Sequence, residues 1–157
     1  ICVRGPLLMS GYLNNPTETA AALAGGWLHT GDIAYRDADG LYYIVDRKKD
    51  VIISGGFNVY PKEIEDAICA HPSVAAAAVI GIPDEKWGET VMAYVQRKTG
   101  CEISEDEVTA AVKEAKGAVA APKNVAFIDA LPLTALGKID KKALRARHWT
   151  AGARAVN

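Results

Sequence analysis

Hydrophobic residues recur at regular spacing over the last two thirds of the chain, from Val51 to about Arg147. Apolar runs between turn residues predict strands, and apolar residues three or four apart predict helices. The run from Val74 to Ile82 is apolar throughout, which is typical of a strand buried on both faces. The pattern predicts six elements in the order strand, helix, strand, strand, helix, strand: 51–54, 61–70, 74–82, 90–97, a helix opened by Ser104, and 124–129.

Local signals mark where the helices begin. Pro61 suits a first helical turn, and Ser104 with Glu107 forms a capping box. A short basic helix from Asp140 to about Arg147 follows a loop that contains proline and glycine. The predicted buried faces consist of Ile64, Ala67 and Ile68 in the first helix, and of Val108, Ala111, Val112 and Ala115 in the second.

The β-α-β-β-α-β order is the split βαβ pattern of small α+β domains. The predicted fold class is therefore α+β, with a central three-stranded sheet, helices and a β-hairpin. Residues 1–48 hold only short predicted strands and one Ala-rich helix, capped by Asn15 and ended by Gly25-Gly26. They have too few apolar residues for a core, so we expect them to be the edge of a larger domain. The expected division is 1–48, 49–150 and a frayed tail, 151–157.

Composition narrows the function classes. The chain has 157 residues, 50% of them hydrophobic and 24% charged, as in soluble globular proteins. Its net charge of −1 indicates neither a nucleic-acid nor an anionic-membrane partner, and no apolar run is long enough for a transmembrane segment. Three scattered cysteines without a CxxC pattern predict no disulfide and no metal site, and favour a cytoplasmic location. The start without methionine suggests a fragment.

The stretch from Val45 to Pro61 lies between the part with few apolar residues and the part with a regular hydrophobic pattern. Five consecutive charges, residues 46–50, are followed by a short apolar strand and by Ser54-Gly55-Gly56. A charge cluster is usually a solvated, salt-bridged turn, and two glycines can be a plain turn. Our hypothesis is a hinge between two domains, with ligand-binding groups on it.

Three further residues are candidates. Asp32, after Thr30-Gly31, either satisfies backbone N–H groups of its own turn or accepts hydrogen bonds from a vicinal diol such as ribose. Lys138, in a loop bracketed by Pro132 and Gly137, is either solvent-facing or a mobile positive charge for an anionic transition state. Trp87 is either a stacking platform or a core residue.

These features, in this order, resemble the C-terminal part of the adenylate-forming acyl-CoA synthetases, the superfamily that includes luciferase and peptide-synthetase adenylation domains. The resembling stretches are 26–32, 46–65 and 132–138. The resemblance implies that a carboxylate attacks the α-phosphate of ATP to give acyl-AMP and pyrophosphate. The thiol of coenzyme A then attacks acyl-AMP to give acyl-CoA and AMP.

By this resemblance, Asp32 binds the ribose hydroxyls of ATP, Arg47 supports it, and Lys49 is the hinge residue. Lys138 is implied to bridge the carboxylate and the α-phosphate during adenylation. After rotation about the hinge, coenzyme A is implied to contact five residues: Ser54, Gly55, Gly56, Trp87 and Lys123. Family members often have an aromatic and a basic residue before Pro122-Lys123, where this chain has Val119, Ala120 and Ala121.

The resemblance implies that the phosphate loop, the acyl pocket and the site for Mg²⁺ with ATP belong to the missing N-terminal domain. We therefore expect these 157 residues alone neither to adenylate nor to form thioesters. The acid is expected to be fatty or aryl. Two alternatives stay open: an adenylating enzyme that transfers its acyl group to a carrier protein or to oxygen, and a stand-alone, non-catalytic binding domain of the same small fold.

Overall fold

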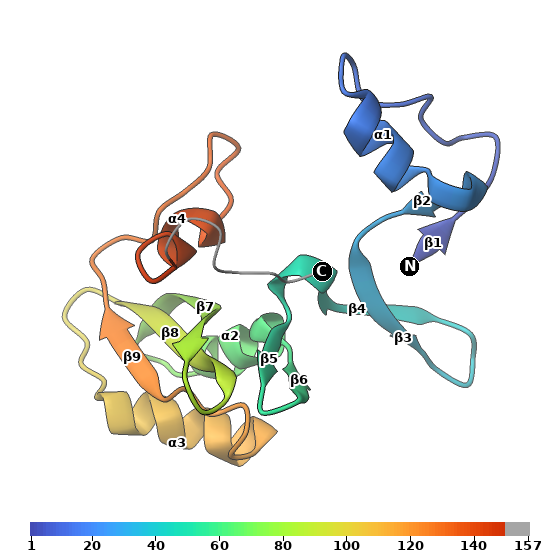
Figure 1. Ribbon diagram of the computed structural model, residues 1–157. Coiled ribbons are helices and arrows are strands. Elements are labelled where there is room, and N and C mark those ends of the chain that lie inside the picture. Colours follow the sequence, from blue (N-terminus) through green and yellow to red (C-terminus); the bar gives the residue numbers. More distant parts are fainter. Residues whose placement is uncertain (150–157) are drawn as a thin grey trace. The chain divides into compact units, whose positions relative to one another are not determined.

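The computed structural model describes residues 1–149 (Figure 1). The chain forms two compact units, with the boundary between Lys48 and Lys49. The predicted tail, 151–157, lies outside the described residues. Each unit is described by itself below.

The first unit consists of short elements. Strand β1 (Cys2–Val3) pairs antiparallel with β2 (Leu28–His29), and β3 (Asp32–Arg36) pairs antiparallel with β4 (Tyr42–Arg47). Helix α1 (Pro16–Ala22) and the 3-10 turn η1 (Ala24–Gly26) precede β2. Within the described part of the chain, every buried hydrophobic side chain lies at Val51 or later. The first unit thus has no hydrophobic core of its own.

The second unit is built on β8 (Gly88–Arg97). One edge of β8 pairs antiparallel with β7 (Val74–Asp84) over its full length. The other edge pairs in parallel with β9 (Asn124–Phe127) and, at its start, antiparallel with β5 (Ile52–Ser54). β5 forms a tight hairpin with β6 (Phe57–Val59). The result is one five-stranded sheet, in which β6, β5, β8 and β7 lie in this order and β9 pairs with β8.

Helices cover the sheet on both faces (Figure 1). Helices α2 (Pro61–Cys69) and α3 (Glu105–Lys116) bury Val79 and Val91 in a larger core. Helix α4 (Lys141–Arg145) packs on the opposite face, where Ile80, Tyr94 and Leu144 form a second core. Successive residues of β7 alternate between these cores, as the two-residue period of a strand requires. Both faces are buried, which confirms the interpretation of the apolar run.

The α+β class is confirmed, and the hairpin of β5 and β6 extends the predicted three-stranded sheet to five strands. The short strand β6 was not predicted, because its sequence, Phe57-Asn58-Val59, has no extended apolar pattern. The prediction for Ala115 is wrong: this residue is exposed, while Val108 and Val112 of the same helix are buried. Among residues 1–149, no helix combines the length and apolar character that crossing a membrane requires.

The capping box of α3 is present as predicted. Glu107 N–H donates to Ser104 Oγ at 3.2 Å, and Ser104 N–H donates to Glu107 Oε2 at 2.8 Å. The backbone N–H of Ser104, and secondarily its hydroxyl, lower the pKa of the Glu107 carboxyl. A lowered pKa means that ionised Glu107 stabilises the folded state above its unfolded pKa, and that this contribution is lost as the pH falls through the folded pKa.

Replacing Ser104 by alanine is expected to lower the free energy of unfolding by about 1 kcal/mol at neutral pH. The difference from wild type should shrink as the pH falls through the lowered pKa of Glu107, because the Ser104 hydroxyl, which only wild type has, then contacts a neutral carboxyl instead of a carboxylate. Urea denaturation at several pH values measures this. Thr99→Ala, at an exposed residue just before α3, is the control and should change little. A Ser104→Ala loss that grows in acid would contradict the assignment.

Candidate functional site

Asp32 and Arg47 form the first candidate site. The two residues are directly paired across β3 and β4, at the end of the ladder. Arg47 Nε lies 3.3 Å from Asp32 Oδ1, and the Asp32 side chain is 22% exposed. The carboxylate is thus oriented by a guanidinium from the neighbouring strand and remains open to a ligand. An ionised carboxylate so placed can accept hydrogen bonds from hydroxyl groups.

The turn before Asp32 is held by backbone contacts. Gly31 has a φ of 77°, and its carbonyl accepts from the Lys48 N–H at 2.8 Å. The Thr30 hydroxyl accepts from the Asp32 N–H at 3.1 Å. These contacts fix the backbone while the Asp32 carboxylate faces Arg47. His29 is engaged locally, 3.2 Å from the Ala24 carbonyl, which agrees with a structural role for this histidine.

The charge run continues into a 3-10 turn, η2 (Lys48–Asp50). Asp50 Oδ1 lies 2.7 Å from Arg145 Nη2, so part of the run is salt-bridged, as the simpler interpretation expected. Lys49, the predicted hinge residue, is exposed and is the first residue of the second unit.

Gly55 and Gly56 form the two-residue turn between β5 and β6. Both have positive φ, 57° and 84°, and Ser54 pairs with Phe57 across them. Positive φ at both central residues is the geometry of a type I′ turn, which favours glycine. The turn also lies against Trp87: the Gly55 N–H donates to the Trp87 carbonyl at 2.9 Å. A Cβ on Gly55 would lie 2.5 Å from Cε3 of that indole.

Trp87 brings the other predicted residues together. The amino groups of Lys86 and Lys123 lie 4.9 Å and 4.7 Å from its ring centroid. Asp84 Oδ1 accepts from the backbone N–H of Trp87 at 2.9 Å, and this bond is the main cause of the lowered pKa of Asp84. The indole is 40% exposed, so it is not a core residue. An exposed ring beside two ammonium groups suits a ligand with an aromatic part and phosphates.

A hollow of about 250 Å³ lies beside this ring. Three of its lining residues, from separate segments, are predicted coenzyme A residues: Ser54, Trp87 and Lys123. The other three were not predicted: Phe57, Ala118 and Val119. The hollow lies just after the C-terminal end of α3, and its lining includes Val119, one of the residues at which this chain departs from the family sequence.

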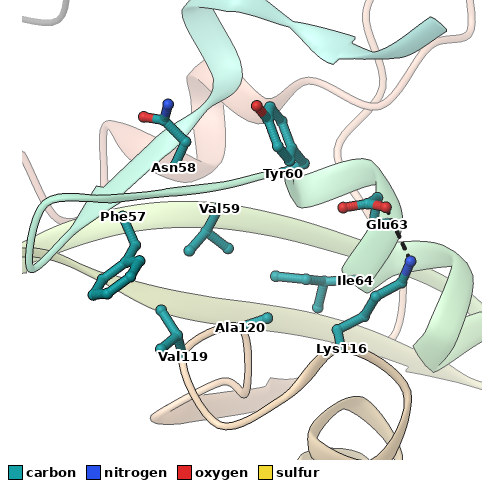
Figure 2. A pocket seen from close by; sticks show the side chains of 9 residues that line it. All are labelled: Phe57, Asn58, Val59, Tyr60, Glu63, Ile64, Lys116, Val119 and Ala120. Atoms are coloured by element: carbon teal, nitrogen blue, oxygen red, sulfur yellow. Dashed lines mark hydrogen bonds and ion pairs between the residues drawn. The ribbon is translucent and has the colours of Figure 1, made fainter. Parts of the chain in front are cut away.

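A second hollow, of about 260 Å³, is also lined by Phe57 and Val119 (Figure 2). Phe57 is 61% exposed and Val119 is 48% exposed, and both line the two hollows. The Lys116–Glu63 ion pair, at 2.9 Å, lies on the rim. Neither apolar residue was singled out in the sequence. An aromatic residue directly after a Gly-Gly hairpin turn was the available signal for Phe57.

Lys138 lies elsewhere. The Thr134 N–H donates to the Lys138 carbonyl at 2.7 Å, and Leu133 pairs with Ile139, so a closed loop presents the lysine. Lys138 is exposed, and the loop leads directly into α4. It therefore belongs to the sheet face opposite α2 and α3. The structure brings together Asp32 with Arg47, and Ser54, Gly55 and Trp87 with Lys123, but it separates Lys138 from that second group.

The described residues contain no group of three or more side chains suited to holding a metal ion. The candidate residues offer oriented charges and hydrogen-bond groups: the Asp32 carboxylate for hydroxyls, the Lys138 ammonium for an anion, and the hollow beside Trp87 and Lys123.

Comparison with known proteins identifies the class. The chain is 55% identical over 163 residues to a medium/long-chain-fatty-acid–CoA ligase of Mycobacterium tuberculosis (strain ATCC 25618 / H37Rv), covering 99% of this chain and 28% of that protein. An amide bond synthetase from Marinactinospora thermotolerans superposes with a TM-score of 0.85 at 40% identity, covering 93% and 30% of the two chains. An o-succinylbenzoate CoA synthetase from Bacillus subtilis, in complex with its acyl-adenylate intermediate, gives 0.85 at 38% identity, covering 92% and 29%.

The sequence relatives are acyl-CoA ligases and the structural neighbours are adenylate-forming enzymes, the superfamily that the sequence motifs indicated. More narrowly, residues 63–138 match the family model described as the AMP-binding enzyme C-terminal domain. The chain spans less than a third of the length of the relatives it matches.

Proposed function

We propose that this chain is part of an ATP-dependent acyl-CoA ligase. The enzyme converts a carboxylic acid, ATP and coenzyme A into acyl-CoA, AMP and pyrophosphate through an acyl-adenylate. The observation that supports this best is the presence of two chemically different faces on the second unit. One carries Lys138 in a loop, and the other carries the Ser54–Trp87–Lys123 hollow.

The first half-reaction uses the groups for ATP and the loop lysine. A carboxylate oxygen bonds to the α-phosphorus of ATP, and the bond to pyrophosphate breaks. Asp32, oriented by Arg47, accepts hydrogen bonds from the ribose hydroxyls. Lys138 places its ammonium between the carboxylate and the α-phosphate, where negative charge builds up in the transition state.

The second half-reaction uses the other face. The sulfur of coenzyme A bonds to the acyl carbon, and AMP leaves. Ser54, Gly55 and Gly56 form a wall for the pantetheine chain, and Trp87 with Lys123 receives the nucleotide end. Since the two faces lie on different sides of one small unit, rotation about Lys49 presents them in turn. In this proposal residues 1–48 are the edge of the large domain and 49–150 form the rotating domain.

The remaining partners lie outside the chain. The N-terminal domain supplies the phosphate loop, the acyl pocket and the site where Mg²⁺ arrives with ATP. The relatives are named for fatty and aryl acids, which favours an acid of one of these classes. The cytoplasm, which holds ATP and coenzyme A, is the proposed location.

One comparison supports an alternative acceptor of the acyl group, in place of coenzyme A. A neighbour at a TM-score of 0.85 is named an amide bond synthetase, so an adenylating enzyme with another acceptor has a similar C-terminal part. The type I′ turn on Trp87, and the hollow with Lys123, favour coenzyme A for this chain.

The deciding experiment screens carboxylic acids with the full-length protein by pyrophosphate release, with and without coenzyme A. Acid-dependent release that turns over only when coenzyme A is present supports the ligase. Turnover that requires an amine or a carrier protein instead supports the second acceptor. No release with any acid contradicts both proposals.

Asp32→Asn in the full-length protein is expected to lower kcat/KM for ATP about tenfold, because one charge-assisted hydrogen bond to ribose is weakened. Wild type should prefer ATP to 2′-deoxy-ATP or 3′-deoxy-ATP, and the variant should lose most of that preference. Steady-state pyrophosphate release with each nucleotide measures this. Asp39→Asn, in an exposed turn of the same unit, is the matched control. An undiminished preference in Asp32→Asn would place the ribose elsewhere.

A further inference from the structure

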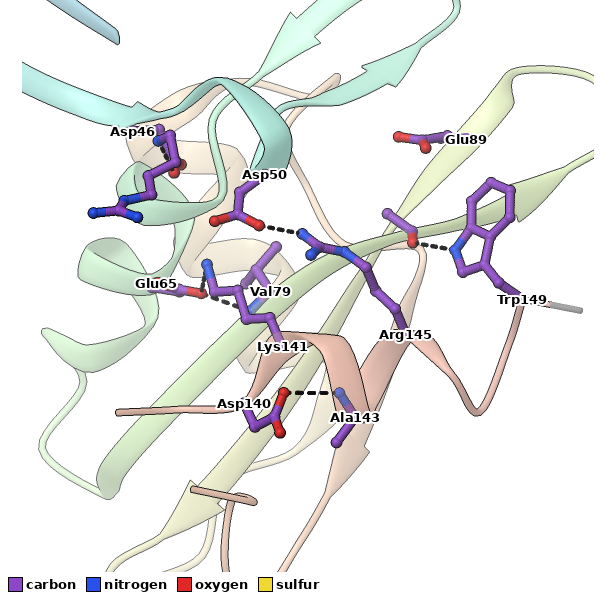
Figure 3. A network of polar contacts seen from close by, with 12 residues as sticks. Asp46, Asp50, Glu65, Val79, Glu89, Asp140, Lys141, Ala143, Arg145 and Trp149 are labelled. Carbon is purple, nitrogen blue, oxygen red and sulfur yellow. Dashed lines mark hydrogen bonds and ion pairs between the residues drawn. The ribbon is translucent and has the colours of Figure 1, made fainter. Parts of the chain in front are cut away.

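Helix α4 is tied to three separate parts of the second unit (Figure 3). Lys141 Nζ lies 2.7 Å from Glu65 Oε1, which also accepts from the Val79 N–H. Arg145 binds Asp50, as described above. Just after the helix, Trp149 Nε1 donates to the Gly81 carbonyl at 2.9 Å. Together with buried Leu144, these contacts fix α4 firmly on the sheet.

The Asp50–Arg145 pair connects residues 95 positions apart. Its Nη2–Oδ1 distance is 2.7 Å, and the side chains are only 14% and 15% exposed. Within residues 1–149, the buried Nε of Arg145 has no hydrogen-bond partner. The ion pair with Asp50 is thus a contact that holds the guanidinium in place. Removing either member leaves the other charge with little access to water, which is costly.

Asp50 immediately follows the proposed pivot. On the N-terminal side, the Lys48 N–H is bonded to Gly31 within the first unit. On the C-terminal side, the Asp50 carboxylate is bonded to α4 within the second unit. Lys49 is the residue between these two anchors. A backbone rotation between the units is therefore confined to the bonds around Lys49.

Helix α4 also continues from the loop of Lys138. The Asp140 N–H donates to the Pro132 carbonyl at 2.7 Å, which closes the base of that loop. The Asp140 side chain then accepts from the Ala143 N–H at 3.0 Å and caps the helix. The loop, α4 and Asp50 therefore form one connected piece, and Arg145 joins its two ends.

We propose that Arg145 is a positioning residue for adenylation: through Asp50 it fixes the C-terminal side of the pivot to the helix that carries the Lys138 loop. Rotation at Lys49 then moves Lys138 together with α4, because the Asp50–Arg145 ion pair connects the C-terminal side of the pivot to that helix. The proposal rests on the proposed function in assigning Lys138 to adenylation. Its competitor is a purely structural pair that contributes only to stability.

The first test measures how firmly the Asp50–Arg145 ion pair holds the hinge, and it does not depend on enzyme activity. Trypsin cleaves after lysine and arginine, and residues 47–49 are Arg-Lys-Lys. Cleavage of a folded protein requires local opening. Arg145→Met in the full-length protein should speed cleavage within residues 47–50 by about tenfold, read by mass spectrometry. Lys142→Met, at an exposed residue of the same helix, is the matched control and should cleave like wild type.

The second test separates positioning from stability. Arg145→Met should lower kcat of pyrophosphate formation about tenfold, with KM for ATP within about twofold of wild type, because small misplacements of a reacting group are costly and ATP is held elsewhere. Thioester formation from preformed acyl-adenylate should fall less. The double variant Asp50→Asn, Arg145→Met removes both charges, so its Tm should recover. Its hinge cleavage should stay faster than in wild type and its adenylation should stay impaired, because the link is still missing.

The outcomes are distinct. Unchanged cleavage in Arg145→Met, unchanged adenylation, or recovery of adenylation together with Tm in the double variant overturns the proposal. If wild type shows no acid-dependent pyrophosphate release, the proposed function fails, and the cleavage rates alone decide whether the anchor exists.

Discussion

Replacing Lys138 by alanine in the full-length protein is expected to lower acyl-adenylate formation by about 10²–10³-fold. One well-placed charge that stabilises a transition state contributes roughly 3–4 kcal/mol. The exposed side chain stands on a loop closed by two bonds that do not involve it: the Thr134 N–H donates to the Lys138 carbonyl, and the Lys138 N–H donates to the Thr134 hydroxyl. Alanine should therefore leave the loop intact. Pyrophosphate release under single-turnover conditions measures the loss.

The second half-reaction supplies the internal control. Thioester formation from preformed acyl-adenylate should be largely spared in Lys138→Ala, because the hollow beside Trp87 lies on the other side of the sheet. Lys142→Ala removes an exposed lysine of the adjoining helix and should leave both half-reactions unchanged. Equal loss in the two half-reactions of Lys138→Ala would show that the assigned role is wrong.

Local patterns predicted most of the fold because its elements are locally encoded. Ser104 and Glu107 mark the start of α3 by their spacing alone, and the unbroken apolar run after Val74 marks a strand buried on both sides. Strand β6 depends instead on its partner: three residues become a strand because a Gly-Gly turn folds them back on β5. Ala115 fits the helical period but lies near the end of α3, where the sheet no longer covers it.

The candidate site also has parts that the sequence predicted and parts that it could not predict. Motif resemblance pointed to Asp32 and Arg47, and a single hairpin register brings them into contact. The hollow could not be derived from one sequence, because Phe57 and Val119 carry no distinctive chemistry and come from segments far apart. The Asp50–Arg145 pair is a similar case: a charge run gives no sign of which distant arginine it will meet.

Gly55→Ala is expected to impair thioester formation strongly while leaving adenylation near wild type. The new methyl group would lie 2.5 Å from the Trp87 ring, so the indole must move or the turn must deform. Either change misplaces the wall and the platform proposed for coenzyme A. A displacement of about 1 Å can cost roughly 10²-fold in rate. We expect a loss of that order in kcat/KM for coenzyme A, measured by thioester formation from preformed acyl-adenylate.

Gly56→Ala makes this test specific. Its φ of 84° is also positive, so alanine strains the same turn, but no atom lies within 4 Å of the added Cβ. The strain of a left-handed alanine, about 1–2 kcal/mol, is common to both variants. Any excess loss in Gly55→Ala therefore reports the contact with Trp87. If both variants lose thioester formation equally, the turn matters only as a turn. If only Gly55→Ala loses it, the indole and the hairpin act together as the surface that receives coenzyme A.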